Sequence, residues 1–111
     1  MATPPQETTR ETLLTSAQLQ QSVHRLLSKW RLSVVQVLRA SPLYFGDIRR
    51  RLPTISEMIL AKELKTLVRL GVLERKVYRQ APRRVEYRLS QKGQQVLPLV
   101  DALIGLGSQF S

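Results

Sequence analysis

Arginine and lysine side chains crowd one central segment of this sequence. Between Arg49 and Lys92 there are thirteen basic and four acidic residues, a net charge of +9, in a chain whose total net charge is +10. A localised cationic surface attracts polyanions, because binding releases the counterions condensed on them. Nucleic acid is therefore the leading partner class. An anionic membrane is the weaker alternative, and a basic surface that serves only solubility is the third.

Catalytic chemistry has few side chains to use. The chain contains no cysteine, which excludes disulfides, thiolate metal ligands, thiol nucleophiles and cysteine redox switches. His24 is the only histidine, so a surface position on a helix is favoured over a transition-metal site. The sparse carboxylates form no acid pair at usable spacing. We expect no enzyme, no cofactor and no metal.

The segment with the clearest pair of opposite faces is a predicted helix over about residues 55–70, ending at Gly71. Thr54 with Glu57 has the form of a capping box, and Ser56 is a competing N-cap. On a helical wheel one face is apolar and the other is basic. The apolar face holds Leu60, Leu64 and Leu67, and the opposite face holds Met58, Lys62, Lys65 and Arg69. One face therefore suits packing and the other suits a polyanion.

A hairpin is predicted after this helix, over about residues 72–89. Val72–Tyr78 and Val85–Leu89 have the composition of strands, and the second alternates strictly between apolar and polar residues. The loop between them is too long for a two-residue turn and contains Arg79, Arg83 and Arg84. We expect this basic tip to project into solvent.

The N-terminal part predicts a flexible tail followed by helices. Residues 1–15 are polar and lack the apolar run of a signal peptide, so they are expected to be mobile. Thr15 with Gln18 predicts a capping box for a first helix, and Ser28 predicts the N-cap of a second, apolar helix. That second helix is expected to stop at Ser41 and Pro42.

A short strand and a short helix are predicted between the second helix and the basic one. Tyr44 and Phe45 suit a very short strand before Gly46. Phe45, Ile48 and Leu52 then recur at helical spacing until Pro53 stops the helix. Trp30, Tyr44 and Phe45 are expected in the core rather than in a ligand pocket.

The last predicted helix covers about residues 90–109, with Ser90 as its cap and a kink at Pro98. Apolar side chains cover most of its circumference, and Asp101 is the only charged residue from Gly93 onward. Such a helix needs cover on more than one side, which a chain of this length can hardly supply alone. We expect a homodimer. Its predicted interface residues are Leu19, Val23, Val96, Val100, Leu103 and Ile104.

The order of these elements predicts an α+β, mainly helical fold: one winged helix-turn-helix domain over residues 16–111 with added N- and C-terminal dimerisation helices. In this architecture a recognition helix enters the major groove and the hairpin, or wing, lies on the neighbouring backbone. Backbone contacts dominate such interfaces. The predicted DNA-binding residues are Arg49, Arg50, Ser56, Glu57, Met58, Ala61, Lys62, Lys65, Arg69, Arg79, Arg83 and Arg84.

From about Ala17 to Gly107 the chain resembles the HxlR-type family of winged-helix regulators. The resemblance rests on Lys29-Trp30, Phe45 to Arg50 with Leu52-Pro53, Ile55-Ser56, Leu64 and Leu67, Gly71 to Arg75, Val85 to Tyr87, and Leu89-Ser90 with Gly93. It implies a homodimer held by the terminal helices on a palindromic operator. Many members carry a cysteine near the start of the first helix, which some use to sense oxidants or electrophiles; Ala17 stands at about that place here, so thiol sensing is excluded. Leu27-Ser28 replaces a usual glycine pair, and Pro82-Arg83 replaces a common pair of prolines.

The sequence thus predicts a cytoplasmic, nucleoid-associated bacterial or archaeal regulator that binds double-stranded DNA with sequence specificity. A non-specific or architectural nucleic-acid binder is the alternative, and a winged helix that only binds proteins is a third hypothesis. The low aromatic content of 5% disfavours stacking on single strands. No membrane partner is expected, because no segment has the length of apolar residues that a span needs. A small-molecule effector is left open, without a candidate.

Overall fold

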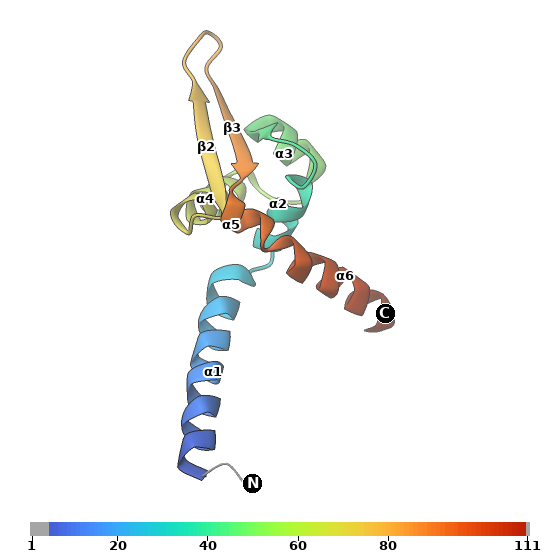
Figure 1. Cartoon of the computed structure of the whole chain (residues 1–111). Helices are drawn as coiled ribbons and strands as arrows, with labels where there is room; N and C mark the ends of the chain where they lie inside the picture. The colour runs from blue at the N-terminus through green and yellow to red at the C-terminus, as the bar shows by residue number, and fades with distance from the viewer. Residues whose placement is uncertain (1–4, 111) are drawn as a thin grey trace.

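The computed structural model describes the backbone of residues 5–110 and the side chains of residues 12, 13 and 15–110 (Figure 1). The elements in order are α1 (Pro5–Leu26), α2 (Arg31–Val37), β1 (Leu43–Tyr44), α3 (Phe45–Arg51), α4 (Glu57–Arg69), β2 (Leu73–Tyr78), β3 (Arg84–Leu89), α5 (Gln91–Gln94) and α6 (Leu97–Phe110). The α2-to-β3 part has the order of a winged helix-turn-helix, so the predicted α+β, mainly helical fold is confirmed.

The first helix begins earlier than the sequence indicates. α1 starts at Pro5, so Thr15 lies inside the helix and the predicted capping box does not form there. Of the expected tail, residues 5–15 are helical, and residues 1–4 lie outside the described residues. A proline suits a first helical turn, because the N–H that it lacks would have no partner there. Polar residues with ordinary helix propensity can then continue the helix.

The second helix is shorter than expected, and Trp30 occupies its N-cap position. The Ser28 hydroxyl accepts a hydrogen bond from the Arg31 backbone N–H at 3.3 Å, so the predicted serine does bind the start of the helix from two residues further back. Val34 and Val35 are completely buried. This confirms the burial expected from the apolar run.

α3 and α4 form the helix-turn-helix. Ile48 is the buried anchor of α3. The Ser56 hydroxyl accepts from the Ile59 N–H at 3.1 Å, so Ser56 and not the Thr54 box caps α4. Gly71, at φ +77, ends this segment in the left-handed backbone region that favours glycine. The recognition helix is thus found within one or two residues of its predicted bounds.

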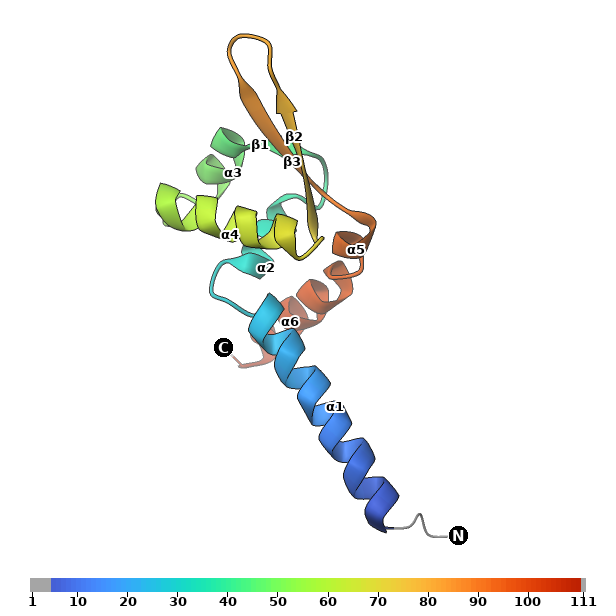
Figure 2. The same ribbon diagram turned by 90° about the vertical axis from the view of Figure 1, so that its left-hand side faces the viewer.

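The wing belongs to a three-stranded antiparallel sheet of order β1-β3-β2. β2 and β3 pair along their whole length, from Leu73 opposite Leu89 to Tyr78 opposite Arg84. β1 adds to the free edge of β3, with Leu43 opposite Tyr87. The far end of the hairpin extends well beyond the helices, as Figures 1 and 2 both show. The predicted two strands and projecting tip are confirmed.

The predicted C-terminal helix is two helices. Ser90 caps the short α5, and its hydroxyl accepts from the Gly93 N–H at 3.0 Å. The chain breaks before α6, so Pro98 lies in the first turn of α6 instead of kinking a continuous helix. Gly93 packs so closely on the residue before β2 that an added Cβ would lie 2.2 Å from the Val72 carbonyl oxygen. This contact fixes α5 against the sheet.

One core joins α2, α3, α4, the sheet and the start of α6. Its largest completely buried side chains are Ile48, Leu60, Leu64, Leu67, Val34, Val35 and Val72. The apolar face predicted for α4 is therefore the face that packs. Within the part of the chain that the structure describes, no helix is both long and apolar enough to cross a membrane.

α1 projects away from this core as a long arm (Figure 1). A globular chain of this length has a radius of gyration of about 13 Å, whereas the value here is 17.8 Å, with a longest extent of 68 Å. In proteins, most of the stability of a helix comes from the packing of its apolar face rather than from helix propensity. The shape therefore leaves α1 in need of a partner surface.

Candidate nucleic-acid interface

The outer face of α4 is exposed and basic. Lys62, Lys65 and Arg69 are exposed on the side opposite to the buried leucines, and Met58 is 78% exposed near the N-terminal end. Ser56, Glu57 and Ala61 are also exposed there. Among the described side chains, no carboxylate forms an ion pair with these three cations. Their charge is therefore uncompensated by the protomer.

Two of the predicted phosphate-binding arginines already have acidic neighbours. Arg49 lies 3.3 Å from Glu57, between α3 and the first turn of α4, and Arg50 pairs with Asp47 inside α3. Exposed ion pairs of this kind contribute about 0–1 kcal/mol. A phosphate can replace such a carboxylate at little cost, so these pairs hold the two guanidinium groups near the surface without withdrawing them.

Arginines and aromatic rings share the outer part of the wing. Arg79 and Arg83 are exposed at the hairpin tip. The Arg84 guanidinium lies 5.2 Å from the centre of the Tyr44 ring, and that ring meets Tyr78 edge-on at 6.2 Å. Because cation–π and edge-to-face contacts restrict the side chains that make them, Arg84 is held while the two tip arginines are free.

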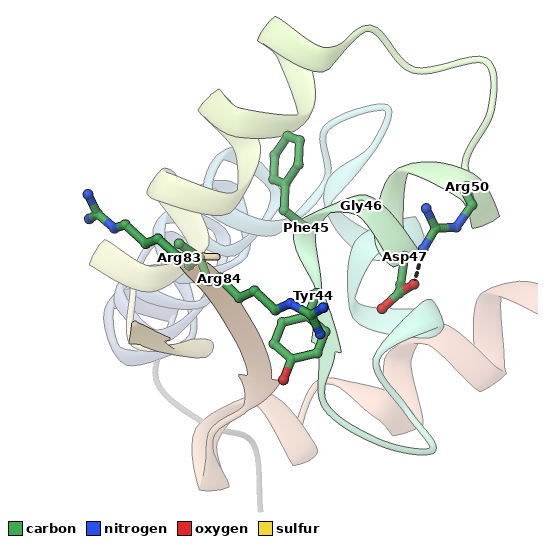
Figure 3. A pocket seen from close by; sticks show the side chains of 8 residues that line it. Tyr44, Phe45, Gly46, Asp47, Arg50, Arg83 and Arg84 are labelled. Atoms are coloured by element: carbon green, nitrogen blue, oxygen red, sulfur yellow. Dashed lines mark hydrogen bonds and ion pairs between the residues drawn. The ribbon is translucent and has the colours of Figure 1, made fainter. Parts of the chain in front are cut away.

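A cavity of about 440 Å³ separates the wing from the start of α3. Figure 3 shows Arg50 bound to Asp47 on one side, Arg84 across the Tyr44 ring, and Arg83 extending away from both. Phe45 lines the cavity and also packs against the core. The cavity therefore joins basic residues from α3 and the wing into one surface.

The structure also shows a polar network that sequence reasoning missed. The Glu63 carboxylate, on the buried side of α4, accepts from the Ser28 hydroxyl at 2.9 Å and from Arg31 Nε at 2.8 Å. Arg31 Nη1 donates in turn to the carbonyl oxygens of Arg25 and His24 at the end of α1, at 2.8 and 3.2 Å. One arginine thus ties α1 and α2 to the recognition helix. The available signal was a lone acidic residue next to the leucine face of α4.

The residues predicted for a dimer interface divide into two groups. Val96 and Val100 are only 8% and 4% exposed and belong to the protomer's own core, so they are removed from the candidate interface. Val96 and Val100 lie on the same apolar stripe as Leu103, and the N-terminal part of this stripe packs against the core of the same protomer. Leu19, Val23, Leu103 and Ile104 are exposed. Further exposed apolar residues on the same two helices are Leu13, Leu99, Leu106 and Phe110.

Fold and surface together define a winged helix-turn-helix transcriptional regulator. Residues 25–111 match the family model described as HxlR-like helix-turn-helix, and the chain belongs to this family. An uncharacterized HTH-type transcriptional regulator of Methanothermobacter thermautotrophicus is 37% identical over 89 residues, covering 80% of this chain and 68% of that protein. The HTH-type regulator YtfH of Escherichia coli is 38% identical over 76 residues, covering 68% and 60%.

Solved structures agree with this assignment. A transcriptional regulator described as MarR family from Porphyromonas gingivalis W83 superposes with a TM-score of 0.78 at 33% identity, covering 81% of this chain and 88% of that one. The reduced form of the redox regulator HypR gives a TM-score of 0.77 at 26% identity, covering 82% and 90%. The predicted family is confirmed, and the chain is a DNA-binding transcription regulator.

Proposed function

We propose that this protein is a homodimer that binds a palindromic operator in double-stranded DNA with sequence specificity and thereby regulates transcription. The observation that carries the proposal is the division of the surface. The basic face of α4 and the arginine-rich wing lie on one side, and the apolar α6 lies on the other (Figure 1). One side suits a polyanion and the other suits a second copy.

On the DNA side, α4 enters the major groove and the wing follows the adjacent backbone. The N-terminal half of α4, with Ser56, Glu57, Met58, Ala61 and Lys62, faces base edges. The arginines of the wing and of α3 bind phosphate, since one guanidinium group can donate two parallel hydrogen bonds to two oxygens of a phosphate. The unpaired cations of α4 support this arrangement, because nothing in the described protomer competes for them.

On the opposite side, α1 and α6 form the dimer surface. α1 has exposed Leu19 and Val23 along an arm that meets the rest of the protomer at its C-terminal end, through Leu26 and Arg31. Leu103 and Ile104 of α6, 41% and 57% exposed, line an apolar groove of about 290 Å³ against α2. Apolar patches of this kind on soluble proteins mark association sites. A second copy covers both helices and pairs two recognition helices for two half-sites.

The first experiment is a selection of bound duplexes from fragmented genomic DNA, in competitor DNA at physiological salt. We expect one inverted repeat to be enriched, with half-sites about one helical turn apart. Binding at low salt with nothing enriched would instead favour the non-specific, architectural alternative. The proposal places the protein in the cytoplasm, at the nucleoid of a bacterial or archaeal cell, and the homologues from Methanothermobacter thermautotrophicus and Escherichia coli support the bacterial or archaeal part.

The role of α4 is tested by removing one charge. Lys62→Gln should lower operator affinity at least about threefold, and it should relax base preference if the contact is to a base edge. Arg39→Gln is the matched control, because it removes the same charge from a residue just after α2 that pairs with Asp101 of α6, on the other side. Equal affinities for wild type and Lys62→Gln would contradict the assignment.

A further inference from the structure

A second cavity, of about 430 Å³, opens between the recognition helix and the base of the wing. Lys65 and Val68 of α4 line it from one side, and Arg75 of β2 and Tyr87 of β3 line it from the other. Arg75 and Tyr87 are directly opposite in the strand register. They share a sheet face with the buried Leu73, because alternate residues of a strand point the same way. Figure 2 shows the C-terminal end of α4 next to the base of the hairpin.

The polar groups of this cavity have no ion-pair or side-chain hydrogen-bond partner among the described residues. Among the described side chains, neither Lys65 nor Arg75 forms an ion pair. Tyr87 is only 9% exposed, yet its hydroxyl makes no hydrogen bond in the described part of the chain. No buried side-chain oxygen or nitrogen in that part lacks a partner. The hydroxyl is therefore the portion of Tyr87 that solvent reaches.

The donor set selects an anion with several acceptor oxygens. The Lys65 ammonium of α4 and the Arg75 guanidinium and Tyr87 phenol of the facing sheet supply the donors, and no carboxylate is among the residues that line the cavity. A tetrahedral phosphate accepts several such bonds at once, and charge-assisted bonds to it are about twice as strong as neutral ones. Val68 is the one apolar residue among those that line the cavity.

We propose that this cavity binds one phosphodiester group of the DNA backbone, at the strand that passes between α4 and the wing. The inference rests on the proposed function and adds Arg75 and Tyr87 to the DNA-binding residues. A phosphate held here by α4 and by both strands of the hairpin sets the angle between the recognition helix and the wing. The contact therefore fixes how α4 is placed in the groove and carries no base preference itself.

The test compares two variants that differ in charge. Arg75→Gln should weaken operator binding about 10- to 100-fold. It should also lower the magnitude of the slope of log affinity against log salt by about 1, because the variant neutralises one phosphate fewer and so releases fewer counterions. Tyr87→Phe should weaken binding about 2- to 10-fold with an unchanged slope, because it removes only a neutral donor. Arg88→Gln is the matched control, since Arg88 lies on the opposite sheet face and pairs with Glu86.

A duplex scan identifies the phosphate. Each backbone phosphate of one half-site is replaced in turn by a neutral methylphosphonate. At one position the wild type should lose affinity while Arg75→Gln loses nothing further, and at other contacted positions both proteins should lose affinity equally. Additive losses at every position, or an Arg75→Gln affinity and slope equal to wild type, would overturn the inference even if the wild type binds its operator normally.

Inorganic phosphate distinguishes a free anion from the DNA backbone. Titration should perturb the NMR signals of Arg75 and Tyr87 only weakly and without saturation at millimolar concentration. Saturable binding of inorganic phosphate, with DNA affinity unaffected by Arg75→Gln, would overturn the DNA assignment. Failure of the proposed function looks different, because the wild type itself would then enrich no duplex.

Discussion

The Glu63 carboxylate offers the sharpest test of how the recognition helix is held. Replacing Glu63 by alanine removes the acceptor of two hydrogen bonds, from Ser28 and from Arg31. It leaves Arg31 with the carbonyl oxygens at the end of α1 as its remaining partners. The substitution therefore removes the hydrogen bonds that link α4 to the start of α2 and, through Arg31, to the end of α1, and it leaves the buried leucines of α4 unchanged.

The magnitude follows from burial and bond type. Hydrogen bonds to a charged group contribute about 1.5–3 kcal/mol each. The side chains of Arg31 and Glu63 are 17% and 10% exposed, so water can replace part of the lost interaction. We expect Glu63→Ala to lower the free energy of unfolding by about 2–4 kcal/mol, less than the sum of two such bonds. Glu63→Gln keeps an acceptor oxygen and should cost about 1–2 kcal/mol.

The assay is urea denaturation followed by circular dichroism, at one fixed protein concentration because association stabilises the folded state. Glu74→Ala is the control, since Glu74 is an exposed glutamate on β2 and should change stability by less than about 0.5 kcal/mol. A double-mutant cycle with Arg31→Ala should give a coupling energy of about 1–3 kcal/mol. If Glu63→Ala matches the Glu74 control, or if the two changes are additive, the network does not hold α4 as argued.

Three further predictions concern packing, the wing and the dimer. Gly93→Ala should destabilise the protein by about 3 kcal/mol, because the new methyl group meets a backbone carbonyl that cannot move freely. Gly105→Ala, in open space, should not destabilise it in the same urea denaturation. Combined Arg83→Ala and Arg84→Ala should weaken binding of all duplex sequences similarly and lower the salt slope by about 2, so an unchanged slope would mean that the wing is not on DNA. Leu103→Asp should give folded monomers by sedimentation and circular dichroism, and a folded dimer would contradict the interface.

Elements with strong periodic patterns and clear end signals were predictable. α4 has a buried leucine face, a serine cap and a glycine stop, and each of these is a local feature of the sequence. The predicted start of α1 was wrong, because polar residues with ordinary helix propensity are found both in helices and in flexible tails. The prediction of one continuous C-terminal helix was also wrong, because α5 ends at Gln94 and α6 begins at Leu97. The close contact of Gly93 with the Val72 carbonyl oxygen is a tertiary contact that local spacing does not contain.

The candidate interfaces were less accessible from the sequence. A helical wheel of α4 predicts that its basic residues are exposed. That no described carboxylate pairs with them depends on the positions of all other side chains. Val96 and Val100 share the spacing of the exposed Leu103, and only the packed core shows that the protomer already buries them. The cavity of Arg75 and Tyr87 requires the strand register and the crossing of α4, neither of which local spacing contains.

The sequence by itself determined the family, the order of the helix-turn-helix and the wing, and the location of the excess positive charge. These depend on residue type and on periodicity along the chain, which are local properties. Tertiary structure alone decided the Glu63–Arg31 link, the pairing of the short first strand with β3, the arm-like α1 and the cavity between α4 and the wing. Each of these depends on contacts between residues distant in the chain, because a folded core brings their side chains together only after the elements have packed.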